Sequence, residues 1–225
     1  MSCTFVFGFN PASVKNFLAL ALSVIFHPLL VPSYLYYIVC YQLPGVVLYP
    51  LLPDRWLVVG VAFGFTFLLP TLCTSGLYWA GVIDSLELYD RRQRTLPFLA
   101  AAVCFGVAAW LFLRTGFAVD ALLRYMMAGM AMAVLLTLLI SLRWKISAHA
   151  VGVGGAVGLL ALLQLSGLAD QEALWWLLGS ILLAGAVLSA RLQLQSHTPA
   201  QVWAGLALGI SLVVGVGVGV AWPKG

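Results

Sequence analysis

Long apolar runs separated by short polar segments make up almost the whole chain, and this pattern restricts it to a membrane-embedded fold. Of its 225 residues, 63% are hydrophobic and only 8% are charged. A soluble domain carries roughly 25% charged residues, because its surface must face water. Lipid must therefore surround most of this chain. Since a backbone in lipid has to pair its polar groups internally, we predict an all-α polytopic membrane helix bundle.

A membrane-spanning helix needs about 20 largely uncharged residues, and the sequence provides about six or seven such helices. The first apolar run, 16–53, contains Pro28 and Pro32, so we expect one kinked span followed by an interfacial or re-entrant piece. The later runs cover residues 56–83, 97–113, 125–142, 146–169, 173–190 and 200–222. Because we find no internal repeat and no linker, we predict one integral membrane domain over residues 1–225.

Cysteine and charge content exclude other classes of protein. The four cysteines form no Cys-x-x-Cys pair, and three of them lie in apolar runs, so we expect small buried side chains and no metal site. The net charge of +4 is modest and no basic tail is present, so we expect no nucleic-acid partner. The sequence does not predict an oligomeric state.

Pairs of glycines recur four residues apart in two of the later runs. They are Gly154 with Gly158, and Gly205 with Gly209. This spacing places both glycines of a pair on one helix face, where the backbone of another helix can approach closely. The alternative is that glycine is simply common in membrane helices.

Three polar segments interrupt the apolar runs, at residues 84–97, 143–149 and 191–201. Two apolar runs separate the first from the second, and two more separate the second from the third. Each pair of spans forms a hairpin that returns to its starting side. We therefore expect all three segments to emerge on the same side of the membrane and to form one shallow site.

The residues in these segments suit phosphoryl transfer. Arginine presents a fork of donors that matches phosphate oxygens, and it keeps its charge. Histidine can act as a nucleophile or as a proton donor near neutral pH. Two histidines among cations can therefore pass a phosphoryl group through a phosphohistidine, one attacking phosphorus and the other protonating the leaving oxygen.

At these positions the chain resembles the type 2 phosphatidic acid phosphatase superfamily, in particular a compact bacterial branch. That family has three motifs: Lys, six residues, Arg-Pro; then Pro-Ser-Gly-His; then Ser-Arg, five residues, His, three residues, Asp. The third motif is the clearest here, with five residues between Arg191 and His197. The second motif is similar to Ile146-Ser147-Ala148-His149, and the arginines before Pro97 take the place of the first. The resemblance spans about residues 84–209.

The resemblance implies a role for each matching residue. His197 would be the nucleophile, His149 the acid for the leaving group, and Arg191 a clamp on the phosphate. Other phosphate-binding residues would be Arg91, Arg94, Lys145 and Ser147. The resemblance further implies a metal-independent enzyme without cofactors that hydrolyses a phosphomonoester or diphosphate of a membrane lipid, of the phosphatidate, phosphatidylglycerol phosphate, polyprenyl diphosphate or lipid A class.

The chain departs from the family pattern in ways that bear on activity. Gln201 stands where the family has the aspartate that orients the nucleophile and supports its charge. A glutamine can still accept a hydrogen bond, so we expect orientation without charge support, unless Asp84, Glu87 or Asp90 supplies a carboxylate. The first segment also lacks the family's lysine. These departures motivate two alternatives: a non-catalytic lipid-phosphate binder or transporter, or a lipid phosphotransferase.

Two further expectations concern His27 and the orientation in the membrane. His27, in Phe-His-Pro, stands beside a helix break, and we interpret it as structural. Lysines and arginines outside the candidate site are too evenly divided between the two sides to set the orientation. Resemblance to the bacterial family favours a bacterial inner membrane with the site on the extracytoplasmic face.

Overall fold

The computed structural model describes residues 11–85, 92–169 and 171–219, which are helical and contain no strand. Six stretches of this part are long and apolar enough to cross a membrane, which confirms the predicted all-α membrane bundle. The helices that form them are α3 (Arg55–Phe63) and α4 (Leu69–Trp79), joined by a π-helical turn at Gly64–Leu68, then α5 (Thr95–Arg114), α6 (Ala121–Ser141), α7 (Ala148–Leu165), α8 (Gln171–Gln193) and α9 (Pro199–Gly219).

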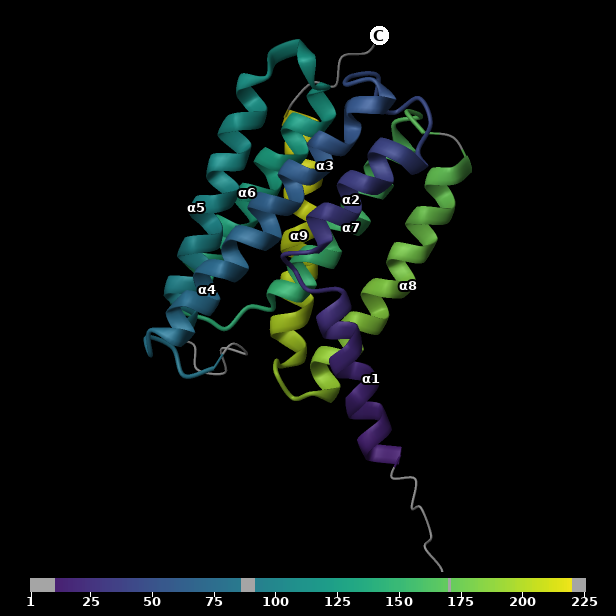
Figure 1. The fold of residues 1–225 in the computed structure, drawn as a ribbon. Coiled ribbons are helices and arrows are strands. Elements are labelled where there is room, and N and C mark those ends of the chain that lie inside the picture. Colours follow the sequence, from purple (N-terminus) through teal and green to yellow (C-terminus); the bar gives the residue numbers. More distant parts are fainter. Residues whose placement is uncertain (1–10, 86–91, 170, 220–225) are drawn as a thin grey trace, which may run out of the picture.

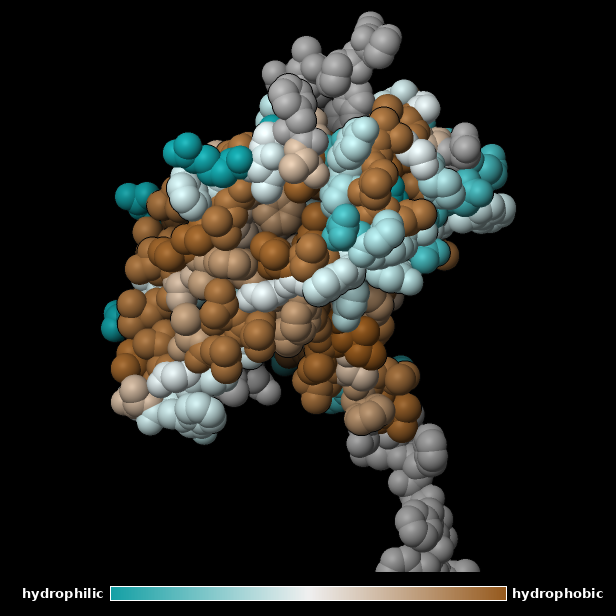
Figure 2. Space-filling view, turned by 45° about the horizontal axis from the view of Figure 1, so that its top comes forward, coloured by the Kyte–Doolittle hydropathy of each residue, from teal (hydrophilic) through white to brown (hydrophobic). Residues whose placement is uncertain are grey.

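The outer surface of these helices is suited to lipid. Figure 2 shows hydrophobic residues over the broad flank of the bundle, with hydrophilic residues concentrated toward its edges. Large apolar side chains are exposed on several helices, among them Trp110, Leu139, Leu182 and Trp203. Exposure of this kind would be unfavourable in water, and it agrees with the composition of the chain.

The N-terminal segment breaks where the sequence predicts a kink. Helix α1 (Pro11–Ile25) ends before Pro28, and α2 (Val31–Tyr37) continues into a π-helical turn at Ile38–Gln42. Proline has no N–H for the preceding turn, so the helix cannot continue through it. Pro32 breaks nothing, because it lies in the first turn of α2, where a missing N–H costs little.

After this turn the chain forms a loop over residues 43–51, held by two charged side chains from other elements. The guanidinium of Arg55, at the start of α3, donates to three backbone carbonyls, those of Cys40, Val47 and Pro50. The carboxylate of Asp120, just before α6, accepts from the backbone N–H groups of Leu48 and Tyr49. These two side chains therefore pair several backbone groups of the loop that no regular structure pairs.

Helices α7 and α9 pack backbone against backbone, which confirms the close contact predicted from the glycine pairs. A Cβ added to Gly154 would lie 2.5 Å from the carbonyl oxygen of Leu206 on α9. A Cβ on Gly205 would lie 2.7 Å from the carbonyl oxygen of Ser147. Real Cβ atoms do not make such contacts, so only glycine allows this helix pair to approach so closely.

The three polar segments lie at one end of the bundle, called here the polar end. It consists of the connection from α4 to α5 as far as it is described, the connection 142–147 and the connection 194–198. In Figure 1 these connections lie at the bottom of the bundle, near α1, whereas the α5–α6 and α7–α8 turns lie at the top. The arrangement follows from two successive helical hairpins, as the sequence predicts.

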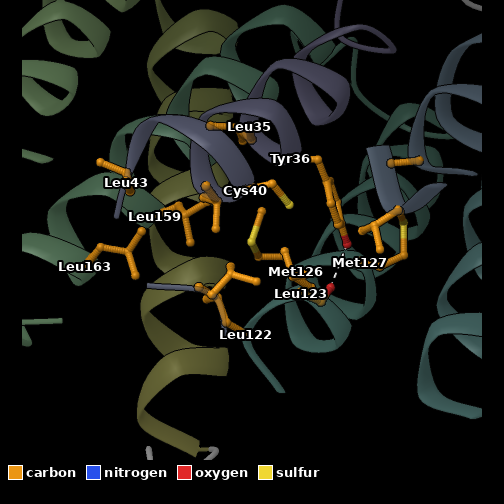
Figure 3. Packing of buried hydrophobic residues seen from close by; sticks show 14 of the residues in the cluster. Leu35, Tyr36, Cys40, Leu43, Leu122, Leu123, Met126, Met127, Leu159 and Leu163 are labelled. Atoms are coloured by element: carbon orange, nitrogen blue, oxygen red, sulfur yellow. Dashed lines mark hydrogen bonds between the residues drawn. The ribbon is translucent and has the colours of Figure 1, made fainter. Parts of the chain in front are cut away.

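A buried apolar cluster closes the opposite end. It joins α2, α5, α6 and α7 around Tyr36, whose hydroxyl donates to the carbonyl oxygen of Leu123 at 2.6 Å. Figure 3 shows Tyr36 reaching α6 above Met126 and Met127, with Leu159 and Leu163 of α7 on the other side of the cluster. Pairing of the phenol hydroxyl removes the cost of burying this polar group.

Candidate functional site

One cavity of about 650 Å³ connects the three polar segments. Its lining includes Arg94 from the first segment, Lys145 and His149 from the second, and Arg191 and His197 from the third. These residues lie up to 103 positions apart in the sequence, and the hairpin topology brings them to one place. The convergence expected from the sequence is therefore present in the fold.

Neither of the two other expected phosphate ligands is among the described residues of this lining. Arg91 lies outside the described residues. Ser147 is fully buried, and its hydroxyl accepts the N–H of Ala150 at 3.4 Å, which caps the start of α7. Such a cap satisfies one of the N–H groups that a helix leaves without a partner in its first turn. The structure thus shows Ser147 as a buried cap of α7.

His197 is buried and held in one orientation. Its Nδ1 lies 3.1 Å from Oε1 of Gln201 and 3.3 Å from the carbonyl oxygen of Lys145. Both partners are acceptors. The Lys145 partner is a backbone carbonyl, and Gln201 Oε1 is identified as an oxygen because it also accepts the N–H of Thr198 at 3.2 Å. The proton of a neutral His197 therefore resides on Nδ1, and Nε2 keeps its lone pair. This is the tautomer that a nucleophilic imidazole requires.

Burial, together with the charges of Arg94, Arg191 and Lys145, lowers the pKa of His197 to about 4, although the hydrogen bond to Gln201 acts in the opposite direction. The imidazole is therefore neutral at physiological pH. Burial, followed by the charges of Arg94 and Arg191, also lowers the pKa of Lys145. Both effects are those of a partly dehydrated, positively charged site.

Gln201 reaches His197 from the first turn of α9. Thr198 and Gln201 form a capping box, in which the Gln201 N–H donates to the Thr198 hydroxyl at 3.4 Å and the Thr198 N–H donates back to Gln201 Oε1. The intervening Pro199 suits the first helical position. The cap fixes the amide oxygen, and the same oxygen accepts from His197. The glutamine thus orients the imidazole, as expected, without adding negative charge.

Carboxylates that could replace the missing charge do not reach the cavity within the described part of the chain. Asp84 is paired with Gln93, which donates to its carboxylate and accepts its backbone N–H. Glu87 and Asp90 lie outside the described residues. No Asp or Glu is among the described residues that line the cavity. The cations of the lining therefore give this end of the cavity a positive field suited to an anion.

His149 occupies the first turn of α7 and contacts the end of α1. Its Nε2 lies 3.0 Å from the carbonyl oxygen of Ser23, which can only accept, so Nε2 carries a proton. This carbonyl is available because the N–H of His27 bonds to Val24 instead. In neutral His149, the lone pair is therefore on the other ring nitrogen, Nδ1.

Ser23, and His27 with its expected structural role, also belong to the surroundings of the site, although the sequence did not assign either residue to it. The Ser23 hydroxyl accepts from Arg191 at 3.1 Å, which joins α1 to α8. The imidazole of His27 meets that of His149 edge to face, with ring centroids 5.6 Å apart and planes at 80°, and it also lines the cavity. Pro28 is the sequence feature that indicates such contacts. A helix broken by proline leaves carbonyls without intrahelical partners in the preceding turn, and these carbonyls can pair with other side chains.

Beyond these polar groups the lining of the cavity is mainly apolar and extends deep into the bundle. Along α7 the lining runs from His149 to Leu162, which at the rise of an α-helix is a length of about 20 Å. Five residues of the lining also belong to the buried cluster, namely Val31, Leu35, Leu122, Met126 and Leu159, of which the last four are labelled in Figure 3. The cavity thus joins a cationic end to an apolar interior.

Comparison of the chain with protein-family models, curated proteins and solved structures gave no match. The function of the site is therefore inferred from its geometry and chemistry.

Proposed function

We propose that this protein is a metal-independent lipid phosphatase that works through a phosphohistidine. The observation that carries the proposal is the cavity itself, which combines a neutral, oriented His197, three cations and an apolar interior that extends along α7. The order and spacing of the three polar segments, which resemble those of type 2 phosphatidic acid phosphatases, point to the same chemistry.

In the first half of the reaction, Nε2 of His197 attacks phosphorus and the bond from phosphorus to the lipid oxygen breaks. Arg94, Lys145 and Arg191 balance the charge that develops on the equatorial phosphate oxygens. The leaving oxygen takes a proton from Nδ1 of His149, which acquires this proton from the monoanionic phosphate as the substrate enters, while its Nε2–H stays on the carbonyl oxygen of Ser23. The products of this half are a lipid alcohol and phosphorylated His197.

In the second half, water attacks phosphorus while His149, now neutral, accepts a proton from it at Nδ1. The bond from phosphorus to Nε2 breaks, phosphate leaves, and His197 regains its lone pair. His149 is protonated again, ready for the next substrate. Each step uses only side chains that line the cavity and one water molecule.

A lipid substrate is favoured over a water-soluble one by the shape of the cavity. A phosphate held among the cations leaves its substituent facing the apolar lining between α6 and α7. A polar substituent would lose water there without gaining hydrogen bonds, whereas an acyl or polyprenyl chain would not. We place the site on the extracytoplasmic face of a bacterial inner membrane, as the family resemblance favours.

The test is release of inorganic phosphate from lysophosphatidate, phosphatidate and a polyprenyl diphosphate by the purified full chain in detergent. We expect release that persists in EDTA, stops with vanadate, which mimics the trigonal bipyramidal transition state, and is lost in His197→Ala. Activity that disappears with EDTA and returns with Mg²⁺ would refute the metal-free mechanism. Binding of lipid phosphate without any release would favour the non-catalytic binder that Gln201 motivates.

A further inference from the structure

His27 is a cavity-lining histidine that the proposed reaction does not use. It lies in the break between α1 and α2, far in sequence from the three polar segments, yet its ring lies against that of His149. A merely structural histidine at a helix break has no need to face a cavity shared with Arg191, Lys145 and His197. Its position therefore calls for a chemical explanation.

The hydrogen bonding of His27 fixes which nitrogen is available. The backbone N–H of Leu29 donates to Nδ1 of His27 at 3.3 Å, so this nitrogen holds a lone pair and the proton of the neutral ring resides on Nε2. The bond is local, spans two residues, and shapes the turn after Pro28. It leaves an Nε2–H donor on a residue that lines the cavity.

His27 and His149 are therefore complementary in their neutral forms. His149 donates a hydrogen bond from Nε2 to the carbonyl oxygen of Ser23 and keeps an acceptor at Nδ1. His27 accepts a hydrogen bond at Nδ1 and keeps a donor at Nε2. An anion that enters beside His149 meets a neutral donor on His27 in addition to the charged donors of the cations. A neutral donor adds directionality without adding positive charge to a crowded cationic site.

We propose that His27 is a third functional histidine, which binds the substrate phosphate by donating a hydrogen bond from Nε2. The proposal rests on the proposed phosphate site but not on turnover, since an anion would bind in the same way without hydrolysis. It replaces our structural interpretation of this residue with one in which the same ring serves both purposes, Nδ1 for the turn and Nε2 for the ligand.

Two substitutions separate these purposes. His27→Asn keeps an acceptor near the position of Nδ1 and removes the donor at Nε2. His27→Gln places an amide N–H₂ near the position of Nε2 and removes the acceptor that Leu29 uses. A structural role therefore predicts that the asparagine variant resembles wild type, whereas a ligand-binding role predicts that the glutamine variant does. His27→Ala removes both groups and serves as the reference for complete loss.

The experiment measures the dissociation constant of orthovanadate by calorimetry for the wild-type chain and the three variants in detergent, together with their thermal unfolding. We expect weakening of about 10- to 100-fold in His27→Asn and His27→Ala, as for a lost hydrogen bond to a charged group, and substantial rescue in His27→Gln. Wild-type affinity in a folded His27→Asn would overturn the proposal, as would a folded His27→Gln that binds no better than His27→Ala.

The two proposals fail in different ways. If the wild-type chain binds vanadate but releases no phosphate from any lipid phosphate, the phosphatase is refuted while the comparison among the His27 variants still decides the role of this residue. If the wild-type chain does not bind vanadate at all, the phosphate site and the role of His27 are both refuted.

Discussion

Oε1 of Gln201 lies 3.1 Å from Nδ1 of His197 and simultaneously accepts the N–H of Thr198. One amide oxygen therefore caps helix α9 and selects the tautomer of the candidate nucleophile. The glutamine does so without the negative charge of an aspartate, and no carboxylate among the described residues of the cavity lining supplies that charge. Orientation and charge support are thus separate properties at this site, and they can be tested separately.

Gln201→Glu adds the charge while keeping the length of the side chain and its capping oxygen. A carboxylate at this distance stabilises the imidazolium, so the pKa of His197 should rise from about 4 by roughly one to three units. Because His197 must be neutral to attack, activity is lost as pH falls through this pKa, and the acid limb of the rate should move to higher pH by the same amount. Turnover at neutral pH should increase.

The measurement is kcat/KM for one lipid phosphate as a function of pH in both proteins. Ionisation of the substrate is the same in the two profiles, so their difference reports His197. Gln201→Ala, which loses orientation and cap together, is the control and should be slower at every pH. Superimposable acid limbs for wild type and Gln201→Glu would show that His197 is not the titrating nucleophile.

Packing of α7 against α9 predicts opposite outcomes for two adjacent glycines. A Cβ at Gly154 would lie 2.5 Å from the backbone oxygen of Leu206, whereas one at Gly155 would meet no atom within 4 Å. Gly154→Ala should destabilise the protein by about 1–3 kcal/mol through overpacking. Gly155→Ala should be neutral or stabilising, because alanine favours the helix. Thermal unfolding in detergent, with both variants in one series, measures the difference, and equal midpoints would argue against the close contact.

The loop over residues 43–51 should depend on Arg55 more than on any interaction of its own. Arg55→Met keeps much of the side-chain volume but leaves three backbone carbonyls to find other partners, at about 1–3 kcal/mol for each one that stays buried. Arg114, which is exposed and stacks on Trp110 at 5.4 Å, provides the matched control. We expect a clear loss of thermal stability in Arg55→Met and little change in Arg114→Met. Similar midpoints would mean that the loop is held by other contacts.

Some features of the fold and the site follow from the sequence by physical necessity. Lipid requires helices, so the apolar runs predict them. Because two spans separate each polar segment from the next, all three segments lie at one end of the bundle. The spacing of three residues between Thr198 and Gln201 likewise predicts the capping box. Each of these rests on a local or periodic rule that tertiary packing does not alter.

Other features depend on contacts that no local rule determines. A serine before a helix can cap it or face a ligand, and only the packing of α7 against α9 decides that Ser147 is buried as a cap. His27 and His149 are 122 residues apart in the sequence, yet their rings are in contact. His149 is held there by the carbonyl of Ser23, which is available only because α1 ends before Pro28. The Arg55 contacts also could not be predicted, since an arginine near a helix end usually lies in solvent.

The apolar interior of the cavity yields a prediction about substrate length. Ala133 of α6 lines the cavity one helical turn beyond Thr137, whereas its neighbour Met132 is exposed on the outer surface. Ala133→Phe should obstruct the path of a long chain and leave the cationic end intact. We expect kcat/KM for oleoyl lysophosphatidate to fall at least about tenfold, as for other misfits in apolar pockets, and kcat/KM for p-nitrophenyl phosphate to stay unchanged. Met132→Phe adds the same ring on the outer face and should affect neither substrate.

Equal losses for both substrates in Ala133→Phe would indicate damage to the fold, and thermal unfolding would identify that case. Unchanged hydrolysis of the long-chain substrate by a folded Ala133→Phe would mean that the chain stays in the bilayer and that the interior of the cavity has no part in recognition.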